Sequence, residues 1–466
     1  MVLNKDRYPR FWTSVTKHIK EQCERVFYKS VRSPINNFMI INKETYPCVW
    51  TSVTKHILEK QYKPYPCFPN CWMDYLDIEG EEIYYAEFMG IDTFMHYRAE
   101  EYVPQDILEK IRQGKVTLLL HCTGHGPHEI VEQAYEHVIG RDKVPPKNLI
   151  LSSESYDLHD SLVWYSQKYK RKKLRDIEPI RIRVAFEFEA YATEWAKSKM
   201  HRETPIEFFK FENKEYGKKF LSLNGLFRDH RAMTVYLLAC YDLLDQGYVS
   251  FNIKEGPIER NGQVIYNHLY EKFTDNEEVK ALFDQNKDKL TKIDSILFDT
   301  HYGVIKENLA DLHPALHNKL FNDSYFSICT ETNFPIIWSK AGEPYWLHTP
   351  QRNDYLVDNI GRLYSEKIFR CVLYKHPFLA VANAKFLEGL RSLGYKTFHP
   401  IIDESYDQEE NHSKRLLMIA KEAKRLCEMN KDQLAEFLEQ CKIICEHNFE
   451  VLQSKTKFAY DLPFRA

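Results

Sequence analysis

The sequence predicts an α/β protein with two Rossmann-like, doubly wound domains. From about residue 115 to residue 410, apolar runs of strand length alternate with amphipathic segments of helix length. Several of these runs end in polar or glycine-containing turns and then enter a helix, which is the order of a βαβ unit. The 466 residues are 44% hydrophobic and include 30 Tyr and 28 Phe, so they supply enough apolar material for more than one core.

The charge balance argues against a general affinity for polyanions. The chain carries 64 basic and 67 acidic residues, a formal charge of −3, so contact with nucleic acid or an anionic membrane has to be local. No apolar run approaches the ~20 residues that a membrane helix needs. The first residues lack the apolar core of a secretion signal, so we expect a cytoplasmic protein.

The cysteines indicate reduced thiols and no metal site. There are 11 of them, an odd number scattered along the chain, and several lie in apolar periodic segments. Cys67 and Cys71 lack a second ligand pair at a spacing suited to zinc, so we expect no metal there.

Residues 1–105 are expected to form an irregular, aromatic-rich N-terminal extension. The octapeptide WTSVTKHI occurs at residues 12–19 and again at 50–57, which indicates a duplication rather than a solenoid. Residues 61–105 have no sustained periodicity, and Pro64, Pro66 and Pro69 disfavour regular structure.

Residues 106–215 are expected to form the first Rossmann-like domain. The predicted strands are Val116–Leu120, Asn148–Ser152 and Ile180–Phe188, and the predicted helices are His128–Val138 and Leu158–Tyr169. The basic run Lys168–Arg175 lies between them. It is either a solvated helix end or loop, or a contact for an anionic acceptor.

Residues 216–410 are expected to form the second Rossmann-like domain. Its predicted strands are Lys218–Leu223, Tyr248–Asn252, Ser295–Thr300, Tyr325–Thr330, Phe378–Ala382 and Tyr395–Phe398. A helix is predicted over Ala232–Asp245, and another over Ala384–Leu393 with Gly394 as a left-handed cap. Residues 411–466 are predicted to be C-terminal helices.

Two short segments of this second domain carry candidate ligand-binding residues. Arg228 and Arg231 follow a predicted strand and enter a helix, which is where ligands bind in open α/β sheets. The alternative is a structural salt bridge to Asp229. In the other segment, Ser365 can cap a helix whose first residues are Glu366 and Lys367, and a helix start attracts anions. The alternative there is a capping carboxylate beside a surface lysine.

The motifs resemble those of glycosyltransferases with the GT-B fold. SICTETN at 327–333, LYSEKIF at 363–369 and the following His-Pro-Phe are similar to the C-terminal signature of the α1,3-fucosyltransferase-like family. Asn224–Arg231, Leu393–Phe398 and Asp403–Asp407 resemble segments of uncharacterised glycosyltransferase-like proteins of large DNA viruses and phages. The resemblance covers roughly residues 215–425.

This resemblance implies a set of residues that bind a nucleotide-diphospho-sugar, with a GDP-linked sugar as one candidate donor. An arginine, Arg228 or Arg231, would hold the diphosphate, and Lys367 would hold the phosphates. Glu366 would hold sugar or ribose hydroxyls, and Tyr364 would flank the nucleotide. The full expected set is Asn224, Arg228, Arg231, Glu331, Tyr364, Glu366 and Lys367. No tightly bound cofactor is expected.

An inverting transfer also needs a general base on the acceptor side. The candidates at predicted strand ends of the first domain are His121, His125, Glu154 and Glu187, of which we rank Glu154 and His125 first. No Glu-x7-Glu pair follows the strands of the second domain, which favours inversion. The acidic segment Asp403–Asp407 is interpreted as a cap and hinge rather than a metal site, because GT-B enzymes generally need no bound metal.

The sequence therefore predicts a hexosyl- or fucosyl-type glycosyltransferase, inverting and metal-independent, whose hydroxyl acceptor is a glycan, a protein or a nucleic acid. The resemblance to viral proteins would place it in a host cytoplasm or a virion. The alternative hypothesis is a non-catalytic structural or binding protein of a virus or phage that keeps the fold.

Overall fold

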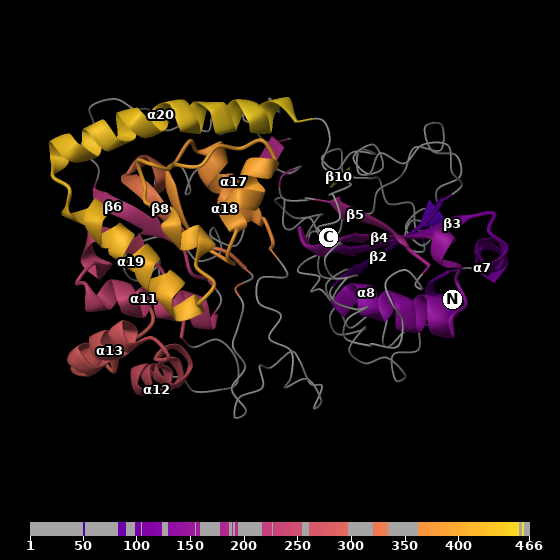
Figure 1. The fold of residues 1–466 in the computed structure, drawn as a ribbon, viewed down its shortest axis with the longest axis horizontal. Coiled ribbons are helices and arrows are strands. Elements are labelled where there is room, and N and C mark those ends of the chain that lie inside the picture. Colours follow the sequence, from indigo (N-terminus) through magenta and orange to yellow (C-terminus); the bar gives the residue numbers. More distant parts are fainter. Residues whose placement is uncertain are drawn as a thin grey trace, which may run out of the picture.

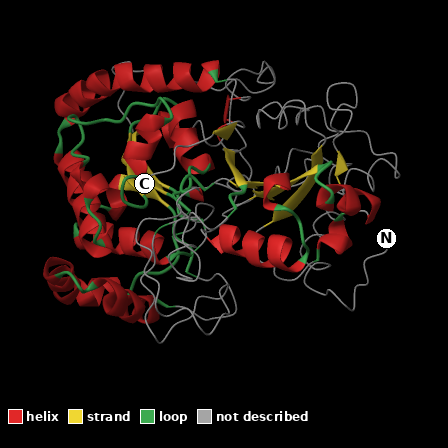
Figure 2. Ribbon diagram, turned by 45° about the vertical axis from the view of Figure 1, so that its right-hand side comes forward, coloured by secondary structure: helices red, strands yellow, loops and turns green. Residues whose placement is uncertain are grey.

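The computed structural model describes residues 50–51, 83–89, 98–103, 105–123, 129–153, 155–158, 178–185, 189, 192–193, 217–225, 227–253, 261–296, 320–332, 334, 362–455 and 459–460. These residues form two β-sheets with helices packed around the strands (Figures 1 and 2). Most strand pairs are parallel, which confirms the predicted α/β class. No helix in these ranges is both long and apolar enough to cross a membrane.

The first sheet has the strand order β1-β2-β3-β4-β5-β10. Its strands are β1 (Trp50–Thr51), β2 (Ile83–Met89), β3 (Thr117–Thr123), β4 (Leu149–Ser153), β5 (Arg181–Ala185) and β10 (Ala459–Tyr460). The first five run parallel, and β10 pairs with β5 in the antiparallel direction. Around them lie α6 (Ala99–Tyr102), α7 (Gln105–Arg112), α8 (Glu129–Gln133), its π-helical continuation η3 (Ala134–Arg141) and η4 (Pro146–Asn148).

The second sheet has the order β7-β6-β8-β9, all parallel. Its strands are β6 (Lys218–Ser222), β7 (Gly247–Val249), β8 (Ser324–Thr330) and β9 (Phe378–Val381). Every residue of β8 and β9 is buried, so helices or loops cover both faces of the sheet. The covering elements are α11 (Asp229–Cys240), η7 (Leu244–Gln246), α12 (Gly262–Phe273), α13 (Glu277–Leu290), α17 (Glu366–Leu373), α18 (Phe386–Ser392), η8 (Ser405–Gln408), α19 (His412–Glu428) and α20 (Lys431–Ser454).

The expectation that residues 1–105 are irregular is wrong for two segments. β1 lies within the second copy of the WTSVTKHI repeat, and β2 pairs with β3 over the whole length of both strands. The signal for β2 was present in its sequence, IYYAEFM, because aromatic and β-branched residues favour strands. The nearby prolines outweighed it in the sequence analysis. The first copy of the repeat lies outside the described residues.

The predicted strand Tyr395–Phe398 is also wrong, and the side chains around it explain why. The backbone N–H of Lys396 donates to Oδ1 of Asn448 at 2.7 Å, and its carbonyl accepts from Nδ2 of Asn448 at 2.9 Å. The N–H of Phe398 donates to a carboxylate oxygen of Glu404. Side chains satisfy the backbone groups that a strand would have paired, so an extended segment forms without joining the sheet. Gly394 does adopt the predicted left-handed conformation, with φ of 95°.

A buried cluster joins the end of β4 to the segment that leads into α17. Ser155 forms an antiparallel bridge with Leu363. The guanidinium of Arg362 donates to the carboxylate of Asp157, and the N–H of Arg362 donates to Oδ2 of the same carboxylate at 2.7 Å. Arg362 also lies over the ring of Tyr156, 4.5 Å from its centroid. Both charges are almost fully buried, so removal of either partner would cost about 3–5 kcal/mol.

His376 fixes the turn that precedes β9. One ring nitrogen lies 2.8 Å from the carbonyl oxygen of Ser324 and the other lies 2.7 Å from the hydroxyl of Ser327, so both anchor points are on β8. The ring is fully buried, and burial lowers its pKa from 6.5 to about 4. The neutral ring is therefore the form that the fold requires.

We predict that acid destabilises the fold through His376. Because the pKa of His376 is lower in the folded chain, its stabilising effect is complete above about pH 6.5 and is lost as the pH falls towards 4. At pH 5 the loss is about 2 kcal/mol. In urea titrations at pH 7 and pH 5, the free energy of unfolding of His376→Gln should fall less between the two pH values than that of the wild type. Equal pH dependence in the two proteins would contradict this account.

Candidate functional site

The topology of the second sheet marks where a ligand would bind. The chain passes from β6 to β7 on one side and later returns to β8 on the other side of β6. The carboxyl ends of β6 and β8 therefore flank a topological switch point, where open α/β sheets bind their ligands. We use "carboxyl edge" for residues 224, 331–334 and 382–383, which follow β6, β8 and β9, together with the first turns of α11 and α17.

Asn224 joins the two strand ends at the switch point. Its side chain is buried, and its Oδ1 accepts a hydrogen bond from the hydroxyl of Thr330 at 2.7 Å. Its Nδ2 donates to Oγ of Ser222 at 3.1 Å, and its backbone N–H donates to Oγ of Ser250 at 2.8 Å. The amide is therefore used to hold the ends of β6 and β8 together.

The first turn of α11 brings two arginines to this edge. Arg228 is the N-cap residue and Arg231 is buried in the first turn. The alternative partner, Asp229, is occupied by other cations: its carboxylate accepts from Nε2 of His268 at 2.9 Å and from Nζ of Lys272 at 2.6 Å. Although burial alone would raise the pKa of Asp229, these two partners hold it well below its usual range. Asp229 is thus committed to α12 rather than paired with the arginines.

Glu331 is the central residue of the edge. Its carboxylate is fully buried and accepts from the hydroxyl and the N–H of Ser365 and from the N–H of Thr332. Burial raises the pKa of Glu331, while the charge of Lys367 and the bonds from Ser365 oppose that rise. The structure uses this carboxylate to attach the start of α17 to the end of β8.

Lys367 turns towards the edge rather than out into solvent. Its Nζ donates to Oγ1 of Thr332 at 2.9 Å, to Oγ of Ser365 at 3.1 Å and to Oε1 of Glu366 at 2.8 Å. Ser365 caps α17 as predicted, since its Oγ accepts from the N–H of Lys367 at 3.3 Å. The ammonium group and the positive end of the helix dipole therefore lie together at the end of β8.

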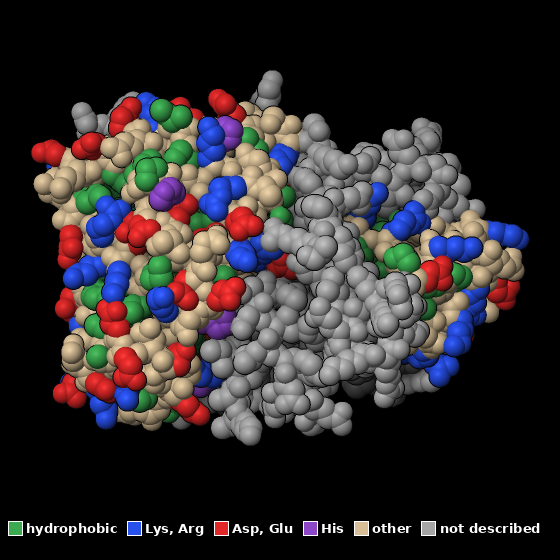
Figure 3. Space-filling model, viewed as in Figure 1, with side chains coloured by type: hydrophobic (Ala, Val, Ile, Leu, Met, Phe, Trp, Pro, Cys, Tyr) green, Lys and Arg blue, Asp and Glu red, His purple; other side chains and the backbone are tan. Residues whose placement is uncertain are grey.

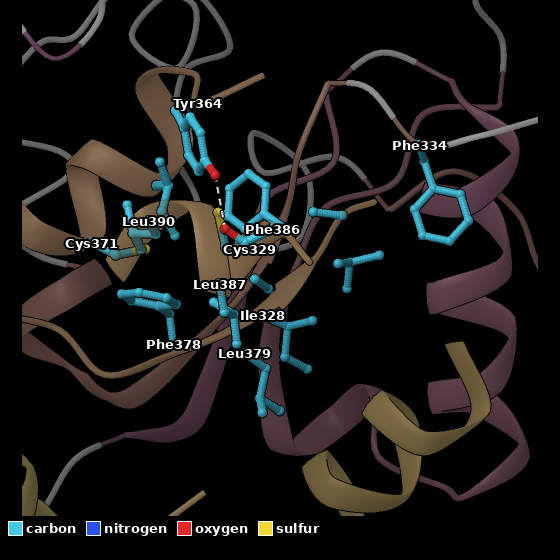
Figure 4. Close-up of a cluster of buried hydrophobic side chains, with 14 of the residues drawn as sticks. Ile328, Cys329, Phe334, Tyr364, Cys371, Phe378, Leu379, Phe386, Leu387 and Leu390 are labelled. Atoms are coloured by element: carbon cyan, nitrogen blue, oxygen red, sulfur yellow. Dashed lines mark hydrogen bonds between the residues drawn. The ribbon is translucent and has the colours of Figure 1, made fainter. Parts of the chain in front are cut away.

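Tyr364 lies in the hydrophobic core instead of at the edge. It is buried, its hydroxyl donates to the carbonyl of Phe386 at 2.9 Å, and its ring packs against Phe386 and Tyr156 (Figure 4). A Cβ atom at Gly389 would lie 2.1 Å from the Tyr364 hydroxyl, so only glycine fits there. In this position Tyr364 supports the start of α17 from below and does not contact a ligand at the edge.

Sequence reasoning missed several residues that complete the edge. Phe334 stacks on His230, with ring centroids 5.0 Å apart, and the guanidinium of Arg415 lies 4.8 Å from the Phe334 centroid. Arg415 is buried in α19 and its Nε donates to the carbonyl of Ala382 at 3.1 Å. Phe334 also stands apart from the core cluster in Figure 4, on the side of α11. The tail helix was read only for its apolar stripe, so its polar face went unnoticed.

The two leading candidates for the catalytic base, Glu154 and His125, lie outside the described residues, as do Glu187 and the basic run Lys168–Arg175. His121 is in β3, where its backbone pairs with Ser152 of β4. Their proposed roles remain predictions.

The acidic segment 403–407 caps local structure. The carboxylate of Asp407 accepts from the N–H groups of Leu387 and Glu388 at 2.8 and 3.0 Å, so it caps α18 rather than the tail helix. Asp403 accepts from the N–H of Ser405 at 3.0 Å. Within the part of the chain that the structure describes, no group of three or more potential metal ligands is found.

A hollow of about 360 Å³ lies at the opposite, amino edge of the second sheet. Its lining includes Lys218 and Tyr325, which begin β6 and β8, and Lys431 at the start of α20. Lys219, also in the lining, donates to the carbonyl of Met429 at 3.1 Å and so closes the end of α19. On the face seen in Figure 3, acidic and basic side chains are interspersed over the second sheet's helices, in agreement with the near-neutral charge.

Comparisons with known proteins place the chain in no family. No family model matches it, and no curated protein matches it in sequence. Among solved structures, the N-terminal domain of trehalose-6-phosphate phosphatase from Candida albicans aligns with 94% of this chain and 85% of its own, at 9% identity and a TM-score of 0.35. A likeness this weak supports no inference. The described residues therefore define an α/β protein with parallel sheets and a cation-rich carboxyl edge.

We predict that Gly389→Ala destabilises the fold through Tyr364. The new methyl group would displace the Tyr364 hydroxyl, and overpacking of this kind costs about 1–3 kcal/mol. Tyr364→Phe removes the hydroxyl and its bond to Phe386, for a loss of about 1 kcal/mol. In the double variant the methyl group has room, so the two losses measured by urea unfolding should sum to more than that of the double variant. Additive losses would show that the contact is unimportant.

Proposed function

We propose that the chain is a glycosyltransferase that moves a hexosyl or fucosyl group from a nucleotide-diphospho-sugar to a hydroxyl acceptor. The supporting observation is the meeting of two helix starts and their cations, Arg228, Arg231 and Lys367, at the switch point between β6 and β8. Helix starts and arginine forks are suited to phosphate oxygens. The proposal rests on this geometry together with the resemblance of the motifs.

The chemistry of transfer explains why cations would be needed there. Breaking the bond between sugar and diphosphate leaves negative charge on the departing nucleoside diphosphate. Lys367 and the arginines would stabilise that charge, and the dipoles of α11 and α17 would add to their effect. With these groups present, the proposed reaction proceeds by inversion without a bound metal, and an acceptor-side base such as Glu154 or His125 takes the hydroxyl proton.

Two connections between the sheets support a GT-B-like arrangement. The end of β4 in the first sheet contacts the segment leading into α17 through Ser155, Asp157 and Arg362. After α20 the chain returns to the first sheet, where β10 pairs with β5. In this arrangement the acceptor side would belong to the first sheet and the donor side to the carboxyl edge of the second.

We predict that Lys367→Ala and Arg228→Ala weaken binding of a nucleotide sugar. Each removes a charge-assisted contact to the diphosphate, so the dissociation constant should rise roughly 10- to 100-fold. Isothermal titration with GDP-, UDP- and ADP-linked sugars measures the effect. Lys421→Ala is the matched control, because Lys421 pairs with Glu278 on the exposed surface of α19. Unchanged affinity in both edge variants would overturn the proposed donor site.

Turnover separates the enzyme from a non-catalytic protein of the same fold. Release of nucleoside diphosphate should be measured for each donor that binds, with and without glycan, protein and nucleic-acid acceptors. We expect release with at least one donor and its loss in Lys367→Ala. Binding without release under all these conditions would favour the alternative, a structural or binding protein of a virus or phage.

A further inference from the structure

Asn383 is a buried polar residue whose amide has no use in the described structure. It directly follows β9 at the carboxyl edge and is 4% exposed. Its Oδ1 is enclosed and has no hydrogen-bond partner. Buried side-chain amides are nearly always hydrogen-bonded, because an unmet acceptor costs about 1–3 kcal/mol. A residue kept in this state calls for a partner that the chain does not supply.

His230 presents a second unmet acceptor at the same edge. Its Nε2 lies 2.8 Å from the carbonyl oxygen of Glu331, and a carbonyl only accepts, so Nε2 carries the proton. Burial and the charge of Arg231 lower the pKa of His230, so the ring is neutral. Its Nδ1 is then a bare acceptor, and it is buried without a partner.

Both groups are attached to the backbone of one residue. The N–H of Glu331 donates to the carbonyl of Val381, two residues before Asn383, at 3.0 Å, and the carbonyl of Glu331 accepts from His230. Phe334 and Arg415 bridge the same space from the other side: Phe334 stacks on His230, and Arg415 bonds Ala382 beside Asn383. The two unmet acceptors therefore lie next to one another and next to the cations of the edge.

We infer that Asn383 and His230 form a hydroxyl-binding pair, and that the ligand of the carboxyl edge carries sugar hydroxyl groups directly beside its diphosphate. The cations suit the anionic part, and the two acceptors suit O–H donors. A bare phosphate or pyrophosphate would satisfy the cations alone. The inference rests on the proposed function and deepens it, because it identifies the part of the ligand that these two residues recognise.

The hydroxyl groups have two possible sources, the ribose of the nucleotide and the transferred sugar. Both present the same donor chemistry, so the probes must separate them. GDP, 2′,3′-dideoxy-GDP, a GDP-linked hexose and pyrophosphate cover the cases. The corresponding uridine or adenosine series replaces them if that nucleotide binds the wild type more tightly.

The decisive variant is Asn383→Leu, which is close in size and removes both polar atoms. We expect its affinity for the nucleotide or the nucleotide sugar to fall about 5- to 20-fold, as for the loss of one buried hydrogen bond, with pyrophosphate binding unchanged. If ribose is the source, dideoxy-GDP should bind the wild type as weakly as GDP binds the variant. If the transferred sugar is the source, only the nucleotide sugar should lose affinity.

Stability provides a second readout that a structural role would not give. Because the Asn383 amide is unpaired in the folded chain, Asn383→Leu should leave the Tm unchanged or raise it. A lower Tm, or nucleotide-sugar and nucleotide affinities equal to those of the wild type, would overturn the inference. Failure of the wild type to bind any nucleotide or nucleotide sugar would instead overturn the proposed function, so the two failures are distinguishable.

Discussion

The carboxyl edge depends on the buried carboxylate of Glu331. Its side chain holds Ser365 and Thr332, its backbone N–H continues the pairing with β9, and its carbonyl receives His230 from α11. One residue thus sets the relative positions of β8, β9, α11 and α17. A charge buried this deeply is expensive unless it is fully hydrogen-bonded, and that requirement fixes the geometry of every group bonded to it. The cations of the edge are therefore held in place before any ligand arrives.

A second constraint links this edge to the first sheet. Arg362, which is paired with Asp157, stands three residues before the N-cap of α17, and its Nη1 also donates to the carbonyl of Lys385 just before α18. The starts of α17 and α18 are consequently fixed to the end of β4 as well as to their own sheet. Catalytic groups from the first half could be positioned against the edge by this one buried cluster.

The sequence predicted the second sheet well because local signals and the fold agree there. Buried apolar runs identified β6, β8 and β9, and Ser365 and Gly394 marked a helix start and a left-handed cap. Tyr395–Phe398 failed because its pairing is decided by Asn448, which is distant in sequence. The site was predicted in part: the cations stand at strand ends and helix starts, where a motif reveals them. Glu331 and Tyr364 were found by motif, but their burial depends on packing that no local pattern encodes.

His230, Asn383 and Arg415 escaped notice for a related reason. Each lies in a segment whose local pattern is satisfied by an ordinary helix or turn, and only the folded chain brings them around Phe334 and Glu331. An unmet buried acceptor is a property of the three-dimensional structure, and composition or periodicity carries no trace of it.

The return of the chain to the first sheet has a consequence for the order of folding. β5 receives its antiparallel neighbour β10 only when residues 459–460 are available, after the whole second sheet and α20 have been made. During synthesis on the ribosome, the β5 side of the first sheet is therefore an open edge while the second half emerges. Open edges are where chains pair wrongly. A nascent chain halted before β10 would be the species most in need of a chaperone.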